Sequence, residues 1–191
     1  ETVIRGCQVR NSGSRGIVAN RSRIRVEDNR IEDTFFPAVH LFAFFGREGG
    51  SGFQEDVRLA GNRIARANLA RQAQADFLGS LCVVCWDRGE VRFGGHRRVT
   101  LENNQIARSW GVDLQVQAAT GVVIRGNRLL DSHELPADTA HGRPVDNRAA
   151  VFLQDVTDAV VEQNELVHPG PHLGDQPLAT VNVAGLRAAQ A

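Results

Sequence analysis

The chain has 191 residues, of which 42% are hydrophobic, and its 22 basic and 22 acidic residues leave no net charge. This composition is typical of a folded domain and excludes a disordered segment. The charges form no block of one sign, so the sequence lacks the electrostatic footprint of a nucleic-acid or membrane-surface binder. We therefore expect neither nucleic acid nor a membrane as a partner.

No apolar run approaches the roughly 20 residues that a membrane-spanning helix needs, and no secretory leader precedes the first strand pattern. Three cysteines are too few for a disulfide framework, and Cys82 and Cys85 lack the second ligand pair of a zinc site. All basic residues are Arg, and the sequence begins at Glu1 directly on an apolar alternation. We expect residues 1–191 to form one domain taken from a longer protein.

Six segments share a pattern in which apolar and polar residues alternate, then a bend and a polar column follow. They are TVIRGCQV (2–9), IRVEDNRI (24–31), VRLAGNRI (57–64), VTLENNQI (99–106), VVIRGNRL (122–129) and AVVEQNEL (159–166). The column holds Cys7, Asn29, Asn62, Asn104, Asn127 and Asn164. Five and three positions before it, and two after it, the residue is Val, Ile or Leu except at Thr2 and Ala159. This alternation predicts strands with one face in a core.

The residue before the column is mostly a type that tolerates positive φ, such as Gly61 or Asp28. Each segment is therefore predicted to be two short strands joined by a tight bend. Successive column members lie 22, 33, 42, 23 and 37 residues apart. The two short spacings define the basic turn of a solenoid, and the longer ones carry insertions.

A third strand is predicted in each turn. The segments are GIVA (16–19), AVHLFA (38–43), LCVVCWD (81–87), VDLQVQ (112–117), AVFLQD (150–155) and ATVNV (179–183). Three strands in a repeat of 22–23 residues predict an all-β parallel solenoid of about six coils. The insertions, at 44–56, 65–80, 88–97 and 131–148, all flank the third strand, so they are expected on one side of the solenoid.

This rhythm resembles that of the right-handed parallel β-helix repeat proteins of the pectin-lyase-like superfamily, and the resemblance covers nearly the whole chain. It implies a right-handed β-helix whose Asn column stacks into a hydrogen-bonded ladder, with the first rung missing at Cys7. It also implies a polysaccharide or glycan ligand and a secreted, periplasmic or cell-surface location. An open sheet edge at Val3–Val9 further suggests that more coils or domains of a parent chain adjoin this one.

The resemblance does not extend to a particular catalytic family. β-Helix lyases commonly use Lys or Arg as base beside calcium-binding acidic clusters, whereas this chain has no Lys and no clear acidic triplet. The signatures of polygalacturonase-like hydrolases are missing as well. We expect no cofactor or metal, with calcium as the open alternative.

Candidate catalytic residues are sought where the coils differ, because loops on a rigid frame carry most functional groups, while the ladder asparagines are expected to be scaffold. Glycoside hydrolysis needs two carboxyls, about 5–5.5 Å apart for retention or 6.5–9.5 Å for inversion. Asp113 with Asp131, or Asp87 with Asp113, are the pairs that neighbouring coils would bring together. His133 is a further acid–base candidate and His141 another, although a loop His is more often simply solvated.

Candidate substrate-binding residues come from the outward side of the third strand. His40, Gln115 and Gln154 point outward if Val112, Leu114, Val151 and Leu153 point inward, whereas segment 81–87 fits either register. Trp86 and Trp110 are placed to stack on a sugar or to pack in the core. Arg66 and Arg108, four residues after the ladder column, are predicted either to pair with Asp33 and Asp131 or to hold an acidic sugar.

Two main functional hypotheses follow. The first is a carbohydrate-active β-helix, of hydrolase or lyase type, that binds and cleaves a polysaccharide in a groove along one sheet. The second is a non-catalytic surface, adhesin-like or spacer module. A third is a periplasmic accessory protein that binds a ligand or metal without turnover.

Overall fold

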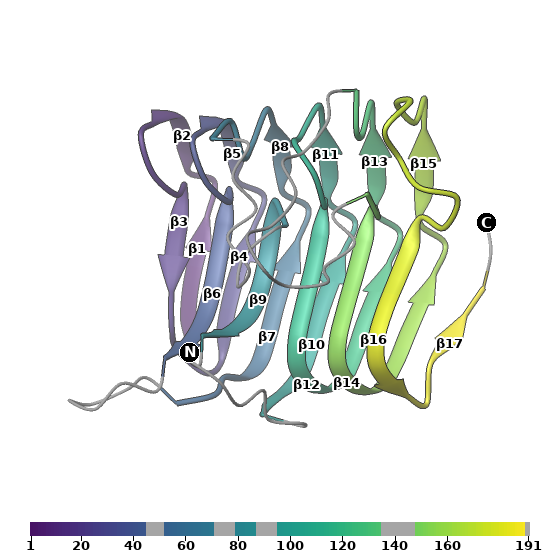
Figure 1. Ribbon diagram of the computed structural model, residues 1–191. Coiled ribbons are helices and arrows are strands. Elements are labelled where there is room, and N and C mark those ends of the chain that lie inside the picture. The colour runs from purple at the N-terminus through teal and green to yellow at the C-terminus, as the bar shows by residue number, and fades with distance from the viewer. Residues whose placement is uncertain (45–51, 71–78, 87–94, 135–147, 190–191) are drawn as a thin grey trace.

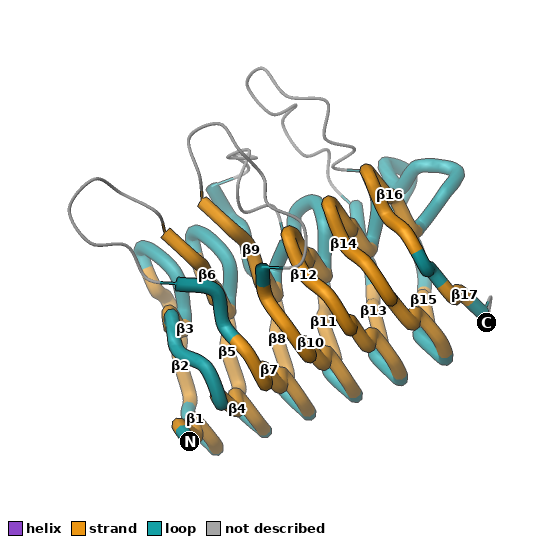
Figure 2. The backbone as a smooth tube through the Cα atoms, turned by 90° about the horizontal axis from the view of Figure 1, so that it is seen from below, coloured by secondary structure: helices purple, strands orange, loops and turns teal. Residues whose placement is uncertain are grey.

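The computed structural model describes residues 1–44, 52–70, 79–86, 95–134 and 148–189. Successive turns of the chain stack along one axis from the N-terminal to the C-terminal end (Figure 1), with their strands side by side (Figure 2). All strand pairs within the described ranges are parallel, and these ranges contain no helix. The predicted parallel β-solenoid is therefore confirmed.

The strands fall into three rows. The first strands are β1 (Thr2–Arg5), β4 (Ile24–Glu27), β7 (Glu55–Ala60), β10 (His96–Glu102) and β17 (Arg187–Ala188). The second are β2 (Gln8–Ser12), β5 (Arg30–Thr34), β8 (Arg63–Ala65), β11 (Gln105–Ala107), β13 (Arg128–Leu130) and β15 (Glu165–Val167). The third are β3 (Ile17–Ala19), β6 (Val39–Phe44), β9 (Leu81–Trp86) and β16 (Leu178–Ala184). There are also two long strands, β12 (Leu114–Arg125) and β14 (Val151–Glu162). Each of them is the third strand of one turn and continues as the first strand of the next turn.

The long strands explain the sheet arrangement. Because β12 and β14 continue from the third row into the first, both rows belong to one 11-stranded sheet. The second strands form a separate six-stranded sheet. The outer face of the third row is thus continuous with the outer face of the first row.

The interior is filled by the apolar columns that the repeat predicts. In the third turn, for example, Val57, Leu59 and Ile64 are all buried. Equivalent residues of the neighbouring turns lie directly beside them in the register. Stacking like residues in columns lets each turn bury its apolar face against its neighbours, as a solenoid requires.

The Asn ladder is present. Asn62 Nδ2 donates to Asn104 Oδ1 at 2.9 Å and to the Val26 carbonyl at 2.8 Å, while its Oδ1 accepts from Asn29. The same arrangement runs through Asn127 to Asn164. At the missing first rung only the Cys7 backbone N–H reaches the ladder, donating to Asn29 Oδ1 at 3.0 Å. Buried amides satisfied in this way hold neighbouring turns in register.

Three columns of six left-handed residues each form the bends. The column before the ladder contains Gly6, Asp28, Gly61, Asn103, Gly126 and Gln163, all with positive φ. A Cβ on Gly61 would lie 2.4 Å from Asp28 Oδ1. The absence of a side chain at Gly61 therefore leaves room for the Asp28 side chain of the neighbouring turn. The column four residues after the ladder is also left-handed in every turn: Asn11, Asp33, Arg66, Arg108, Asp131 and His168. The third bend column contains Arg23, Asp56, Arg98, Gly121, Asp158 and Gly185.

The structure resolves the register of the third strands. Leu81 and Val83 belong to the main core, whereas Cys82 and Val84 form a separate outer cluster. The inward orientation predicted for Val112 is wrong, because Val112 packs with Phe152 in an outer cluster just before β12 begins. Alternation fails there because residue 112 precedes the regular strand.

The predicted insertions lie largely outside the described residues. The ranges 45–51, 71–78, 87–94 and 135–147 are not described, and they include Asp87 and His141. Parts of the predicted insertions are instead strand, since β7 begins at Glu55 and β10 begins at His96.

Candidate functional site

The outer face of the third strands carries two rows of side chains. Pairing in the register gives one row of Val18, His40, Cys82, Gln115, Phe152 and Ala179. The second row contains Phe42, Val84, Gln117, Gln154 and Val181. Polar groups are therefore concentrated on β12 and β14, with apolar neighbours on both sides.

Asp113 stands at the entrance of β12 and is fully buried. Burial raises the pKa of its carboxyl to about 7, although the hydrogen bond from Ser132 opposes the shift. Ser132 Oγ donates to Asp113 Oδ2 at 2.5 Å, and Oδ1 has no hydrogen-bond partner among the described residues. A carboxyl that titrates near neutrality is suited to proton transfer.

Of the other predicted catalytic residues, Asp131 and His133 lie on either side of Ser132 in the chain. Asp131 directly precedes Ser132, so the segment that carries Asp131 also carries the hydroxyl partner of Asp113. The Asp131 carboxylate is held by Arg108 Nε at 3.4 Å. His133 follows Ser132 and is buried, with its backbone carbonyl accepting from the His172 N–H. Asp87, the alternative partner of Asp113, lies outside the described residues.

Gln115 and His40 occupy the first outer row and are both buried. Gln115 Oε1 accepts from the Gly79 N–H at 2.9 Å and from the Cys82 thiol at 3.4 Å. Burial lowers the pKa of His40 to about 3, so its imidazole is neutral near pH 7, and it stacks on Phe42 with centroids 5.0 Å apart. Burial also raises the pKa of the Cys82 thiol, which makes it a poor nucleophile.

The outer face opens toward solvent over β14 and β16. Gln117 Nε2 donates to Gln154 Oε1 at 3.1 Å, and Gln154 is partly exposed. On β16, Asn182 is exposed and donates to Asp155 Oδ1 at 3.0 Å, beside Val181, which is 36% exposed. Amide and carboxylate groups thus lead from the buried residues of β12 to an accessible surface.

The predicted arginine rim contains ion pairs. Arg66 binds both carboxylate oxygens of Asp33, at 2.5 and 2.8 Å, and Arg108 pairs with Asp131. The Arg66 guanidinium lowers the pKa of Asp33. All four residues lie in the left-handed bend, so this column has a structural role whatever else it binds.

The two tryptophans predicted to stack on a sugar or to pack in the core lie in different parts of the fold. Trp110 is half-buried, and its carbonyl accepts from Asn68 Nδ2 at 3.4 Å. Trp86 is the last residue of β9, and its side chain lies outside the described part of the structure. Stacking of either ring on a sugar therefore stays a prediction.

The sequence model of the family described as "Right handed beta helix region" matches residues 1–170. The chain belongs to this family. The match covers most of the chain and agrees with the parallel sheets, so the solenoid is a right-handed parallel β-helix. A search of curated proteins gives no match to this β-helix.

No helix in the described ranges is long and apolar enough to cross a membrane. No group of three or more His, Cys, Asp or Glu side chains in those ranges is arranged to hold a metal ion.

Sequence reasoning missed a charged array on the outer face of the first strands of this β-helix. Arg58 forms ion pairs with Glu27 on one side and Glu102 on the other, at 2.7 Å for Glu102. Arg5 and Arg125 pair with the outer sides of the same two glutamates. The signal available in the sequence was Ala60, the one apolar residue at the position two residues before the ladder column. Its small side chain leaves room for Arg58.

Proposed function

We propose that this β-helix binds a glycan along the outer face of its third strands. The observation that carries the proposal is the pair Gln115 and Gln117 on β12, with Asp113 directly before that strand. All three side chains are buried, and in the register Gln115 lies beside Phe152 and Gln117 beside Gln154. Convergent polar groups among apolar side chains, mounted on a rigid strand, are typical of ligand sites.

The chemistry of the face suits sugar hydroxyls. Amides and carboxyls offer both donors and acceptors, and Gln154 and Asn182 present such groups where the face is accessible. Val181 provides an adjacent apolar surface. We infer that the glycan contacts β14 and β16 first and extends along the row toward β12.

Cleavage is the second part of the proposal. Asp113 would transfer the proton because its raised pKa keeps a protonated fraction at neutral pH. Asp131, ion-paired with Arg108, would supply the second carboxyl. Two carboxyls in different environments are what acid and base roles in glycoside hydrolysis require.

A glycan array followed by a reducing-sugar assay tests both parts. Gln154→Ala should weaken binding, and Gln105→Ala, an exposed amide on the opposite six-stranded sheet, should leave it unchanged. Asp113→Asn should abolish product formation while retaining binding. Equal binding by the Gln154 variant rejects the site, and product from the Asp113 variant rejects the catalytic role.

A non-catalytic module is the second candidate function. The observation that favours it is the pairing of acidic side chains with arginine, because Glu27, Glu102, Asp33 and Asp131 all form ion pairs. Paired carboxylates stabilise the wall of a solenoid without doing chemistry. Binding of a glycan without any product selects this function.

A further inference from the structure

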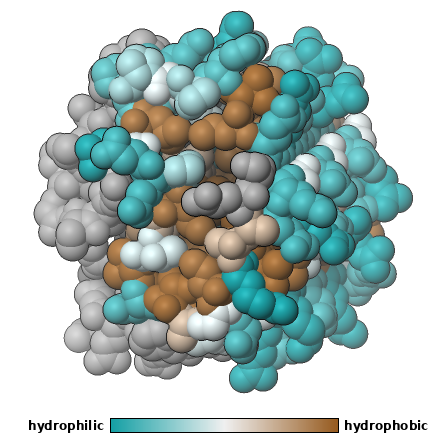
Figure 3. All heavy atoms as spheres, turned by 90° about the vertical axis from the view of Figure 1, so that its right-hand side faces the viewer, coloured by the Kyte–Doolittle hydropathy of each residue, from teal (hydrophilic) through white to brown (hydrophobic). Residues whose placement is uncertain are grey.

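The largest buried cluster of the β-helix is apolar, and Figure 3 shows apolar side chains in the middle of its C-terminal end. The bend between the second and third rows of strands differs from this pattern halfway along the chain. Four polar side chains are buried there: Ser80, Ser109, Asp113 and Ser132. Buried polar groups need hydrogen-bond partners, so the contacts of these four residues decide what the bend can bind.

The register places the four residues next to one another. The Leu81 N–H donates to the Asp113 carbonyl at 2.9 Å, so Ser80, directly before Leu81, lies beside Asp113 in the neighbouring turn. Ser109 and Ser132 both follow the ladder column by five residues, so they too are neighbours in successive turns. The hydrogen bond from Ser132 Oγ to Asp113 Oδ2 joins the two pairs into one cluster.

Three oxygens of this cluster have no hydrogen-bond partner among the described residues. They are Ser80 Oγ, Ser109 Oγ and Asp113 Oδ1. None of them bonds to another, so each lies farther from the other two than a direct hydrogen bond allows. Native proteins satisfy such buried groups with ordered water, which indicates one shared partner placed between the three oxygens.

Small side chains border the cluster. Ala67 is the neighbour of Ser109 in the preceding turn, where its carbonyl accepts from the Trp110 N–H at 3.2 Å. On the other side, the Asp113 N–H donates to the Ala150 carbonyl at 2.9 Å. Both alanines are buried and carry only a methyl group. A buried water needs room and two to four polar partners, and the cluster offers three oxygens beside two small side chains.

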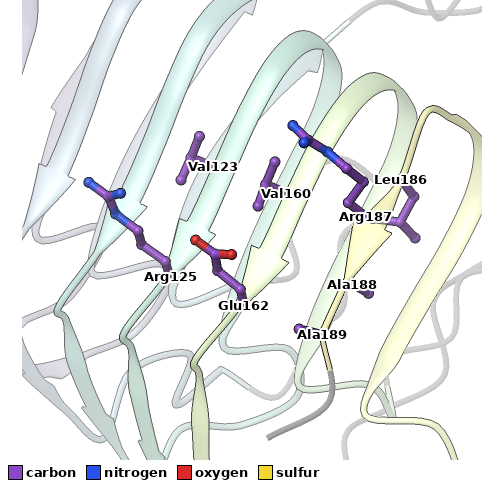
Figure 4. Close-up of a pocket in the computed structure, with 8 residues that line it drawn as sticks. All are labelled: Val123, Arg125, Val160, Glu162, Leu186, Arg187, Ala188 and Ala189. Atoms are coloured by element: carbon purple, nitrogen blue, oxygen red, sulfur yellow. The ribbon is translucent and has the colours of Figure 1, made fainter.

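Bulk solvent does not reach these oxygens, unlike the charged groups on the outer face of the first strands. Figure 4 shows Arg125, Glu162 and Arg187 around a hollow there, and both arginines are exposed. Water from solution can solvate that hollow. Ser80 and Asp113 have no exposed surface, so only a water molecule held within the protein can serve them.

We infer that one buried water molecule is bound by Ser80 Oγ, Ser109 Oγ and Asp113 Oδ1. It donates to Oδ1 when the carboxyl is ionised and accepts from the Oδ1–H when the carboxyl is protonated. Ser80 and Ser109 thus act on Oδ1 through the water, as Ser132 acts directly on Oδ2, and are positioning residues for this carboxyl. Their part in cleavage rests on the proposed function, whereas the water site does not.

The titratable groups nearest to Asp113 in the bend do not replace the water. Asp131 and His133 flank Ser132 in the chain, and the Asp131 carboxylate is paired with Arg108. The pKa of Asp113 is raised by burial and lowered by the Ser132 hydrogen bond, with no charged group among the causes. A water that donates to the ionised carboxyl also favours the charged form, so its removal should raise the pKa further.

A high-resolution crystal structure of the protein tests the site directly. Density for one water within about 3.2 Å of all three oxygens is expected, and the Ser80→Ala, Ser109→Ala double variant should lack it. A dry bend, or hydroxyls that turn to bond one another directly, would overturn the inference.

A carbon-13 NMR titration of the Asp113 carboxyl separates positioning from simple packing. The double variant should titrate about half to one pH unit higher than wild type, as expected for the loss of one hydrogen bond to the ionised form. Ser12→Ala is the matched control, because Ser12 holds the same column position in the first turn and bonds the Arg15 carbonyl instead. Equal midpoints for the double variant and wild type would reject the positioning role. A protein that shows the water and the shifted midpoint but cleaves no glycan supports the inference and rejects only the proposed cleavage.

Discussion

Ser132 donates a hydrogen bond to Asp113 across neighbouring turns, at 2.5 Å from Oγ to Oδ2. This contact joins the start of a third strand to the bend that follows β13. It satisfies one oxygen of a carboxyl that is otherwise surrounded by protein. Because a hydroxyl is the only described partner, burial dominates and the carboxyl stays protonated to an unusually high pH.

Asp113→Asn should change the pH dependence of stability. The folded pKa of Asp113, about 7, lies above its ordinary value of 3.8, so stability from the protonated carboxyl is lost as pH rises from about 4 to 7. Asn has no such loss. The melting temperature of the variant relative to wild type should therefore rise between pH 5 and pH 8, and a constant difference would refute the buried titration.

His96→Gln should destabilise the protein and remove part of its acid sensitivity. The ring accepts from the Gln54 N–H at Nδ1, 3.1 Å, and contacts the Val84 carbonyl from Nε2, 3.0 Å. Burial lowers the pKa of His96 to about 4, although the Val84 hydrogen bond opposes the shift, so its stabilisation is lost as pH falls from 6.5 toward 4. Urea unfolding at pH 7 should show a loss of roughly 1–3 kcal/mol, which shrinks at pH 4.5.

Asn104→Ala should destabilise the fold by roughly 2–4 kcal/mol, because its amide serves both neighbouring rungs. Removing it deprives the Asn62 amide and the Leu59 carbonyl of buried partners. By contrast Cys7→Asn should stabilise by about 0.5–1 kcal/mol, since the new Nδ2 can donate to Asn29. Chemical denaturation of both variants measures the effects, and a neutral Asn104→Ala would contradict the role of the ladder.

Arg58→Met should show how much the charged array on the first strands contributes to the stability of the fold. Glu27 and Glu102 are buried, and each would keep only one arginine. Hydrogen bonds from Arg5 and Arg58 lower the pKa of Glu27, and those from Arg125 and Arg58 outweigh burial and lower the pKa of Glu102. We expect the free energy of unfolding to fall by roughly 2–4 kcal/mol near pH 7, and the loss to diminish below pH 4.5. Thermal unfolding at both pH values measures the effect. Arg128→Met, an exposed pair with Glu165, is the control and should change little.

The scaffold was predictable because it is repeated. Each turn specifies the same apolar columns, and the Asn column with Gly61 or Asp28 before it specifies the same bend. Local chemistry settles such features without knowledge of the rest of the chain. The pairing of Arg66 with Asp33 followed in the same way, from equal spacing in neighbouring turns.

The candidate site was less predictable, because it depends on what lies across the fold. Nothing in the sequence near Asp113 shows that Ser132 contacts it or that it is fully buried. Val112 was placed inward because it fits the alternation, yet the strand had not begun. Arg58 was overlooked because its effect depends on the small size of Ala60, which appeared only as an exception to the pattern.

The most direct test of glycan binding is a crystal structure of the protein soaked with its best glycan from the array. We predict sugar density along the outer face of β14 and β16, with hydroxyls within hydrogen-bond distance of Gln154 and Asn182. Sugar bound only over the six-stranded sheet or at an end of the solenoid would contradict the proposal.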